Sequence, residues 1–167
     1  MIVKIKKNNM QKEHFLSSIF LIIRNNEGKI LLQRRQGTKL WPDFLALPAG
    51  HVDLGENVYE AAIREAKEEL DINIDPTDII DTFVVNRENK TLPPYFDVYF
   101  EISKYKGTIK INEPEKCSEL VWAEMTNLPE EMIDFEKRAI INNLNGIKFS
   151  ADYADNEVKL IRTPHKK

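Results

Sequence analysis

Apolar residues gather in short runs along the first third of the chain, separated by turn-forming segments. Ser18–Ile23 and Lys29–Arg34 are rich in β-branched residues and leucine, and residues 24–28, which end in glycine, separate them. Two such runs around a short turn predict a β-hairpin. The apolar stretch from Phe15 to Ile23 is far shorter than the roughly 20 residues of a membrane span. We therefore expect a buried strand and no membrane partner.

The next segment has the pattern of an amphipathic helix from Val58 to Leu70. Asn57 is a favourable N-cap residue, and Glu60 follows three positions later, as in a capping box. Five apolar positions with i, i+3, i+4 spacing are expected to form its buried face: Tyr59, Ala62, Ile63, Ala66 and Leu70. Asp71 follows the helix, where a residue able to adopt the left-handed conformation is needed.

The rest of the chain alternates between strand and helix patterns. Ile79–Asn86, Tyr95–Ile102 and Leu120–Ala123 are predicted to be strands, and a helix is predicted from Glu130 to Leu144. Hairpins and helices in one chain favour an α/β fold with a mixed β-sheet flanked by helices. We expect a single domain over residues 1–167.

Composition narrows the class of protein. The chain has 167 residues, 42% apolar and 31% charged, which is typical of a globular domain and excludes disordered and collagen-like chains. The net charge of −3 argues against stable nucleic-acid binding. The single cysteine, Cys117, excludes a cysteine-rich zinc site and fits a cytoplasmic location. Oligomeric state is left open between a monomer and a homodimer.

Three glutamates of the predicted helix share one side. With about 100° per residue, and Tyr59 at zero, Glu68 lies near 180°, Glu65 near 240° and Glu69 near 280°. Like charges at i, i+4 destabilise a helix by only about 0.2–0.5 kcal/mol per pair. A solvated helix face therefore remains one interpretation. The other is a site for Mg²⁺ or Mn²⁺, because these ions prefer crowded oxygen ligands.

The segment from Gly50 to Ile72 resembles the Nudix box, G-x5-E-x7-R-E-U-x-E-E-x-G-U, where U is aliphatic. The six most diagnostic places are filled by Gly50, Glu56, Arg64, Glu65, Glu68 and Glu69. Two positions depart from the pattern: Asp71 replaces a glycine, and Ala66 is a small version of the aliphatic residue. The resemblance covers about residues 17–144 and leaves residues 145–167 as a tail of unknown role.

This resemblance implies a Nudix-type α/β/α sandwich that hydrolyses a nucleoside diphosphate linked to another moiety. It implies that three carboxylates and one backbone carbonyl hold divalent metal, Mg²⁺ or Mn²⁺: Glu65, Glu68, Glu69 and Ala49. Arg64 would orient Glu65 through an ion pair, and Glu65 or Glu68 would be the base that takes a proton from water. Glu56 would bind metal or stabilise the box.

The substrate is less well indicated. A short chain without an extra domain resembles the MutT-like branch, whose substrates are nucleoside triphosphates, including oxidised ones. The expected products are the monophosphate and pyrophosphate. The alternatives are an ADP-ribose or nucleotide-sugar pyrophosphatase and a non-catalytic module that senses a nucleotide.

Several residues outside the box are candidates for substrate binding. Trp41 and Phe44 precede it and would form a lip over the substrate. Asn86 and Arg87 lie on a predicted strand that could reach the cleft, and Glu113 is a candidate further carboxylate. Each also has a simpler interpretation as a core aromatic or a surface polar residue. Trp122 is expected in the core. In the tail, a last strand at 158–161, a dimer contact and a loose end remain alternatives.

Overall fold

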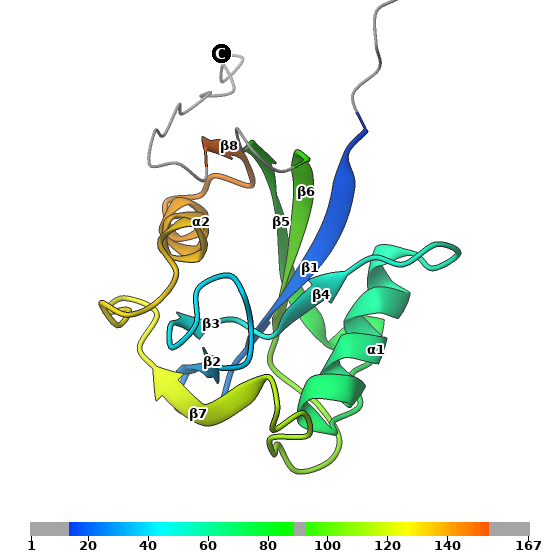
Figure 1. The fold of residues 1–167 in the computed structure, drawn as a ribbon, viewed down its shortest axis with the longest axis vertical. Coiled ribbons are helices and arrows are strands. Elements are labelled where there is room, and N and C mark those ends of the chain that lie inside the picture. Colours follow the sequence, from blue (N-terminus) through cyan, green and yellow to red (C-terminus); the bar gives the residue numbers. More distant parts are fainter. Residues whose placement is uncertain (1–13, 89–92, 154–167) are drawn as a thin grey trace, which may run out of the picture.

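The computed structural model describes residues 14–88 and 93–153, which form two sheets and two α-helices (Figure 1). The five-stranded sheet has the order β4-β1-β6-β5-β8, and the three-stranded sheet has the order β3-β2-β7. The strands are β1 Leu16–Ile23, β2 Ile30–Arg35, β3 Leu45–Ala46, β4 Ala49–His51, β5 Ile79–Glu88, β6 Tyr95–Ile102, β7 Cys117–Ala123 and β8 Phe149–Tyr153. The helices are α1 Val58–Leu70, α2 Asp134–Leu144 and a 3₁₀ turn, η1 Pro76–Asp78.

The helices cover opposite faces of the larger sheet, as Figure 1 shows for α1 and α2 on either side of β1. Ile19, Leu21 and Ile23 of β1 belong to the core that α1 covers, whereas Phe20 and Ile22 belong to the core that α2 covers. A strand buried on both faces needs such an unbroken apolar run. The sheet is mixed, because β1 pairs parallel to β6 and antiparallel to β4. The predicted α/β/α arrangement is confirmed.

Helix α1 has the predicted ends. Asn57 accepts hydrogen bonds from the backbone of Tyr59 and Glu60, and the Glu60 side chain accepts one from the Asn57 backbone. Asp71 adopts the left-handed conformation with φ of 55°. Its carboxylate has a lowered pKa of about 2, first because Lys110 donates a hydrogen bond to it and then because Lys67 does.

The buried face of α1 differs from the predicted one. Ala61 is buried beside Ala62, Ala66 and Leu70, while Tyr59 and Ile63 are 46% and 36% exposed. Tyr59 stacks on Phe100 at a centroid distance of 5.3 Å and still faces solvent on one side. Because the three central contacts are alanines, the helix lies close to the sheet and its larger side chains fall at the margin.

The predicted hairpin of residues 18–34 is wrong as a pairing. Both runs are strands, but β1 and β2 belong to different sheets and meet only at an isolated bridge between Arg24 and Ile30. One edge of β1 pairs with β6 along its whole length. Its other edge pairs with β4 and donates a hydrogen bond from Leu21 N to the Pro48 carbonyl. Among the described residues, pairing of β2 with this edge is therefore limited to the first residue of β2, which bridges to Arg24, the residue that follows β1.

The three strands predicted later in the chain are confirmed as β5, β6 and β7, and each observed strand includes all the residues predicted for it. The second helix starts at Asp134 rather than at Glu130. The reason is that Leu45 of β3 accepts a hydrogen bond from Ile133 N and donates one to Glu131 O, which holds this segment extended. Trp122 is 36% exposed on the edge strand β7, so its predicted core position is wrong. The strand suggested at 158–161 falls outside the described residues.

A buried carboxyl group joins α2 to the connection between β3 and β4. Leu47 N donates a hydrogen bond of 2.7 Å to Glu136, whose side chain is only 2% exposed. Burial raises the pKa of Glu136 to about 8, and Asp97 of β6 adds to the rise. The Leu47 amide, Arg35 of β2 and Arg87 of β5 oppose it.

No helix in the described ranges has the length and apolarity required to cross a bilayer.

The raised pKa of Glu136 makes stability depend on pH. Since the folded state keeps a proton on this group that the unfolded chain releases near its ordinary pKa, the free energy of unfolding falls as pH rises from about 5 to about 8. We predict that Glu136→Gln makes this fall shallower, as measured by urea unfolding at several pH values. A residual slope is expected, because burial also raises the pKa of Glu69 to about 8. An unchanged slope in the variant would contradict the assignment.

Candidate functional site

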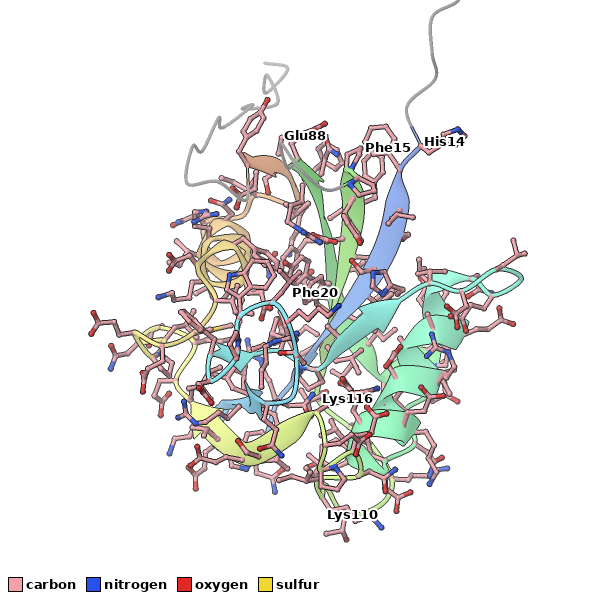
Figure 2. The ribbon with its side chains drawn as sticks, viewed as in Figure 1. His14, Phe15, Phe20, Glu88, Lys110 and Lys116 are labelled. Carbon is pink, nitrogen blue, oxygen red and sulfur yellow. The ribbon has the colours of Figure 1, made fainter. Side chains whose placement is uncertain are left out.

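A cavity of about 440 Å³ lies where β1, β2, β4, α1 and α2 meet. Glu65 and Glu69 of α1 line one end, together with Ala49 and Gly50 of β4. Glu136 and Phe135 of α2 also line the cavity. Its volume is in the range of small-molecule sites in proteins. Phe20, labelled in Figure 2, projects from β1 into the middle of the molecule and contributes to the cavity wall.

The Glu65 side chain lies directly against the backbone of Gly50. A Cβ atom placed on Gly50 would stand 1.8 Å from Glu65 Oε1 and 2.0 Å from Glu65 Cδ. Such distances are far inside van der Waals contact, so this position requires the absence of a side chain. The glycine of the sequence motif therefore has a packing reason in this fold: it lets a carboxylate from α1 reach the β4 backbone.

Arg64 connects the carboxylates of α1 to the loop before the helix. It donates hydrogen bonds of 2.6 and 3.1 Å to Glu56, 2.6 Å to Glu65 and 3.1 Å to Glu68. It also donates one of 2.9 Å to the His51 carbonyl. Its hydrogen bonds to Glu56 and then to Glu65 raise the pKa of Arg64, while its hydrogen bond to Glu56 lowers the pKa of that carboxyl. The five donors of a guanidinium suit this branching arrangement.

Glu69 is the most deeply placed carboxylate of α1. It accepts hydrogen bonds of 2.8 Å from Gln33 Nε2 and 3.1 Å from Ala49 N. Burial raises the pKa of Glu69 to about 8, and the charges of Glu65 and Glu113 add to the rise. Burial also raises the pKa of Glu65, although the hydrogen bond from Arg64 opposes this shift. Two acidic groups are thus held near each other in a poorly solvated place.

This end of the cavity carries the kinds of oxygen donor that a divalent cation prefers, although in the described ranges they are not gathered into one cluster. Glu69 has only neutral donors as hydrogen-bond partners among the described residues, so its charge is compensated by no ion pair there. Carboxylate and carbonyl oxygens are the ligands that Mg²⁺ and Mn²⁺ prefer. Within the described ranges, no group of three or more His, Cys, Asp or Glu side chains is arranged to hold an ion. In this structure, Glu65 and Glu68 instead accept hydrogen bonds from Arg64.

The structure brings some of the sequence candidates together and leaves others apart. The cavity is lined by Trp41, Ala49, Gly50, Arg64, Glu65, Glu69, Arg87 and Glu113. Glu68 does not line it, and its side chain is 51% exposed. Phe44 lines a separate hollow with Glu130 and Glu131. Asn86 is not among the lining residues, and its side-chain amide donates a hydrogen bond to the carbonyl of Tyr95, which does line the cavity.

Arg87 and Glu113 reach the cavity but already have ionic partners. Arg87 is 7% exposed, pairs with buried Asp97 at 2.5 Å and lies over the Tyr95 ring. Glu113 accepts a hydrogen bond of 2.7 Å from Lys116, which is labelled in Figure 2 just before β7.

Gln33 and Glu136 are among the polar residues of the cavity that were not identified from the sequence. Gln33 directly follows the apolar residues Ile30–Leu32 of β2 and is buried with them. Glu136 sits on the buried stripe of α2 with Ala139, Ile140 and Asn143. In both cases, the sequence signal was a polar residue at a position where the pattern of the element predicts burial. Their partners, Glu69 and Leu47, lie 36 and 89 positions away in sequence, which local patterns do not connect.

Comparison with known proteins identifies the family of this chain. The family model described as NUDIX domain matches residues 14–144. A segment of 59 residues, 35% of this chain, is 41% identical to "Putative 8-oxo-dGTP diphosphatase" of Bacillus subtilis (strain 168) and spans 37% of that protein. A second relative, "ADP-ribose pyrophosphatase" of Methanocaldococcus jannaschii, is 29% identical over 115 residues, which are 69% of this chain and 66% of the relative.

Solved structures share the fold at low sequence identity. The MutT protein from Methanosarcina mazei Go1 has a TM-score of 0.70 and 23% identity, covering 83% of this chain and 99% of that one. The MutT NUDIX hydrolase from Burkholderia pseudomallei has a TM-score of 0.65 and 23% identity, covering 77% and 98%. Since the family model matches residues 14–144, which include the box, both α-helices and every strand except β8, this chain belongs to the NUDIX domain family.

Proposed function

We propose that this protein is a divalent-metal-dependent Nudix hydrolase that cleaves the diphosphate linkage of a nucleoside triphosphate, releasing the monophosphate and pyrophosphate. The observation that carries the proposal is the placement of Glu65 and Glu69 at one end of a cavity whose wall includes Trp41, Phe135 and Phe20. Carboxylates at one end and an aromatic wall beyond them suit a ligand with a phosphate chain and a base. The name of the Bacillus subtilis relative supports a triphosphate substrate.

Within this proposal the Ala49 carbonyl, Glu65, Glu68 and Glu69 would hold Mg²⁺ or Mn²⁺. When bound, the ion supplies positive charge that stabilises the phosphate oxygens. Arg64 orients Glu65 and Glu68 and keeps Glu56 close to the start of α1. Glu65 takes a proton from the attacking water, a role that its position in the cavity favours over half-exposed Glu68. No covalent intermediate is required.

A substrate panel tests the class of reaction. Purified protein with Mg²⁺ or Mn²⁺ is assayed against nucleoside triphosphates, oxidised triphosphates, ADP-ribose, nucleotide sugars and a capped or triphosphorylated RNA. We expect metal-dependent release of pyrophosphate and monophosphate from triphosphates. Turnover confined to ADP-ribose would keep the mechanism and overturn the substrate, in line with the Methanocaldococcus jannaschii relative. Tight nucleotide binding without turnover would favour a sensing module.

Replacing the proposed base tests the site itself. We predict that Glu65→Gln lowers kcat by about 10²–10⁴, the usual contribution of a general base, with little change in thermal unfolding. Glu60→Gln is the matched control: it makes the same chemical change on the same helix, and glutamine also serves in a capping box. The control should retain wild-type kcat. Equal loss in both variants would show an effect on α1 rather than on catalysis.

Gly50→Ala tests the contact between β4 and the Glu65 side chain. Because the new methyl group would occupy the place of the Glu65 carboxylate, that side chain must rotate away. We predict a fall in kcat of at least tenfold, while the melting temperature changes little, since a side chain moves more easily than the backbone. Steady-state kinetics and thermal unfolding of the same preparation measure both. Wild-type kcat in the alanine variant would show that Glu65 is not used in this position.

A further inference from the structure

The proposed function uses the Glu65 and Glu69 end of the cavity and leaves another buried acid in its wall unexplained. Glu136 lines the cavity with a side chain that is 2% exposed. Leu47 N donates to its Oε2 atom at 2.7 Å. Glu136 thus reaches the cavity from α2, on the opposite side of the sheet from the helix that carries Glu65.

Glu136 lacks the ion pair that neighbouring buried acids have. Asp97 is paired with Arg87, and Asp152 is paired with Arg138. In residues 14–88 and 93–153, no lysine or arginine forms such a pair with Glu136. A buried carboxylate without a paired cation is costly, so burial favours the neutral acid and raises the pKa of Glu136 to about 8, although the charges of Arg35 and Arg87 oppose this rise. A neutral carboxyl group offers one hydrogen-bond donor and one acceptor.

The surroundings of Glu136 suit a flat aromatic ligand. Trp41 packs on Phe135 with a centroid distance of 5.5 Å, and both residues line the cavity. Trp41 adopts a φ of 49°, a conformation that large side chains rarely take, and it lines the cavity from the loop before β3. The guanidinium carbon of Arg87 lies 4.7 Å from the ring centroid of Phe135. A largely apolar wall with a small number of precisely placed polar groups is usual in pockets that bind small molecules.

We propose that Glu136 is a specificity-determining residue that holds the heteroaromatic base of the substrate by donating a hydrogen bond from its carboxyl group to a base acceptor, while Trp41 covers the ring. This inference rests on the proposed function, because it places the phosphate chain at the Glu65 and Glu69 end. Oε2 accepts the hydrogen bond from Leu47 N, which leaves Oε1 to carry the proton that the proposal donates to the base. The base contacts described here lie outside the Nudix box.

The test compares a substrate that has a base with one that lacks it. The ratio of kcat/KM for a nucleoside triphosphate to kcat/KM for ribose 5-triphosphate measures what the base contributes, and general damage to the enzyme cancels in it. Glu136→Met removes the polar group at similar size. We expect this ratio to fall by about 10- to 100-fold, mainly through KM of the nucleotide, because a buried hydrogen bond to substrate is lost.

Glu136→Gln is the matched variant, since its amide keeps one acceptor for Leu47 N and one donor for the base. It should keep the ratio within about threefold. An unchanged ratio in Glu136→Met, or an equal loss in both variants, would overturn the proposal. Should Glu136→Met fail to fold, Trp41→Leu serves instead, with a similar fall expected and an unchanged ratio as the contrary result.

Failure of the proposed function would be seen separately. If the wild-type protein hydrolyses neither triphosphate, the activity is wrong, and calorimetric binding of nucleoside monophosphates then decides the role of Glu136. Binding that is retained in Glu136→Gln and lost in Glu136→Met supports the base contact. Equal binding by wild type and Glu136→Met overturns it.

Discussion

The structure of this protein depends on holding acidic side chains close together where water is scarce. Glu65 and Glu69 lie on the buried side of α1, and burial raises the pKa of both. Such an arrangement is unfavourable unless the surroundings compensate the charge. Arg64 compensates it on one side, and neutral donors from β2 and β4 hold Glu69 on the other. The remaining negative potential is what a divalent cation would neutralise.

Several other features of the fold position these acidic side chains. The three alanines of α1 bring the helix close to the sheet, and Gly50 leaves space for the Glu65 carboxylate. The Asn57 cap and the left-handed Asp71 fix both ends of the helix, so the glutamates keep their register relative to β4. Across the sheet, α2 contributes Phe135 and Glu136 to the same cavity. The proposed metal ligands and the proposed base contact therefore come from opposite helical layers.

Features set by neighbours in sequence were predictable, and features set by distant contacts were not. The capping box at Asn57 and the turn at Asp71 follow from local rules, and they were predicted correctly. The hairpin prediction failed because β6 and β4 occupy both edges of β1, which no local pattern shows. For the site, the box identified Gly50 and Glu65 as diagnostic positions, but the contact between them was not predicted. Glu136 required knowledge of a contact with Leu47 across 89 positions.

The most direct test of the central claim is an anomalous-difference map from crystals soaked in Mn²⁺, collected near the manganese absorption edge. The account predicts a peak at the Glu65 and Glu69 end of the cavity, beside the Ala49 carbonyl, that is absent from Glu69→Gln crystals treated in the same way. No peak there at saturating Mn²⁺, or an equal peak in the variant, would contradict the account and leave the buried glutamates as structural groups.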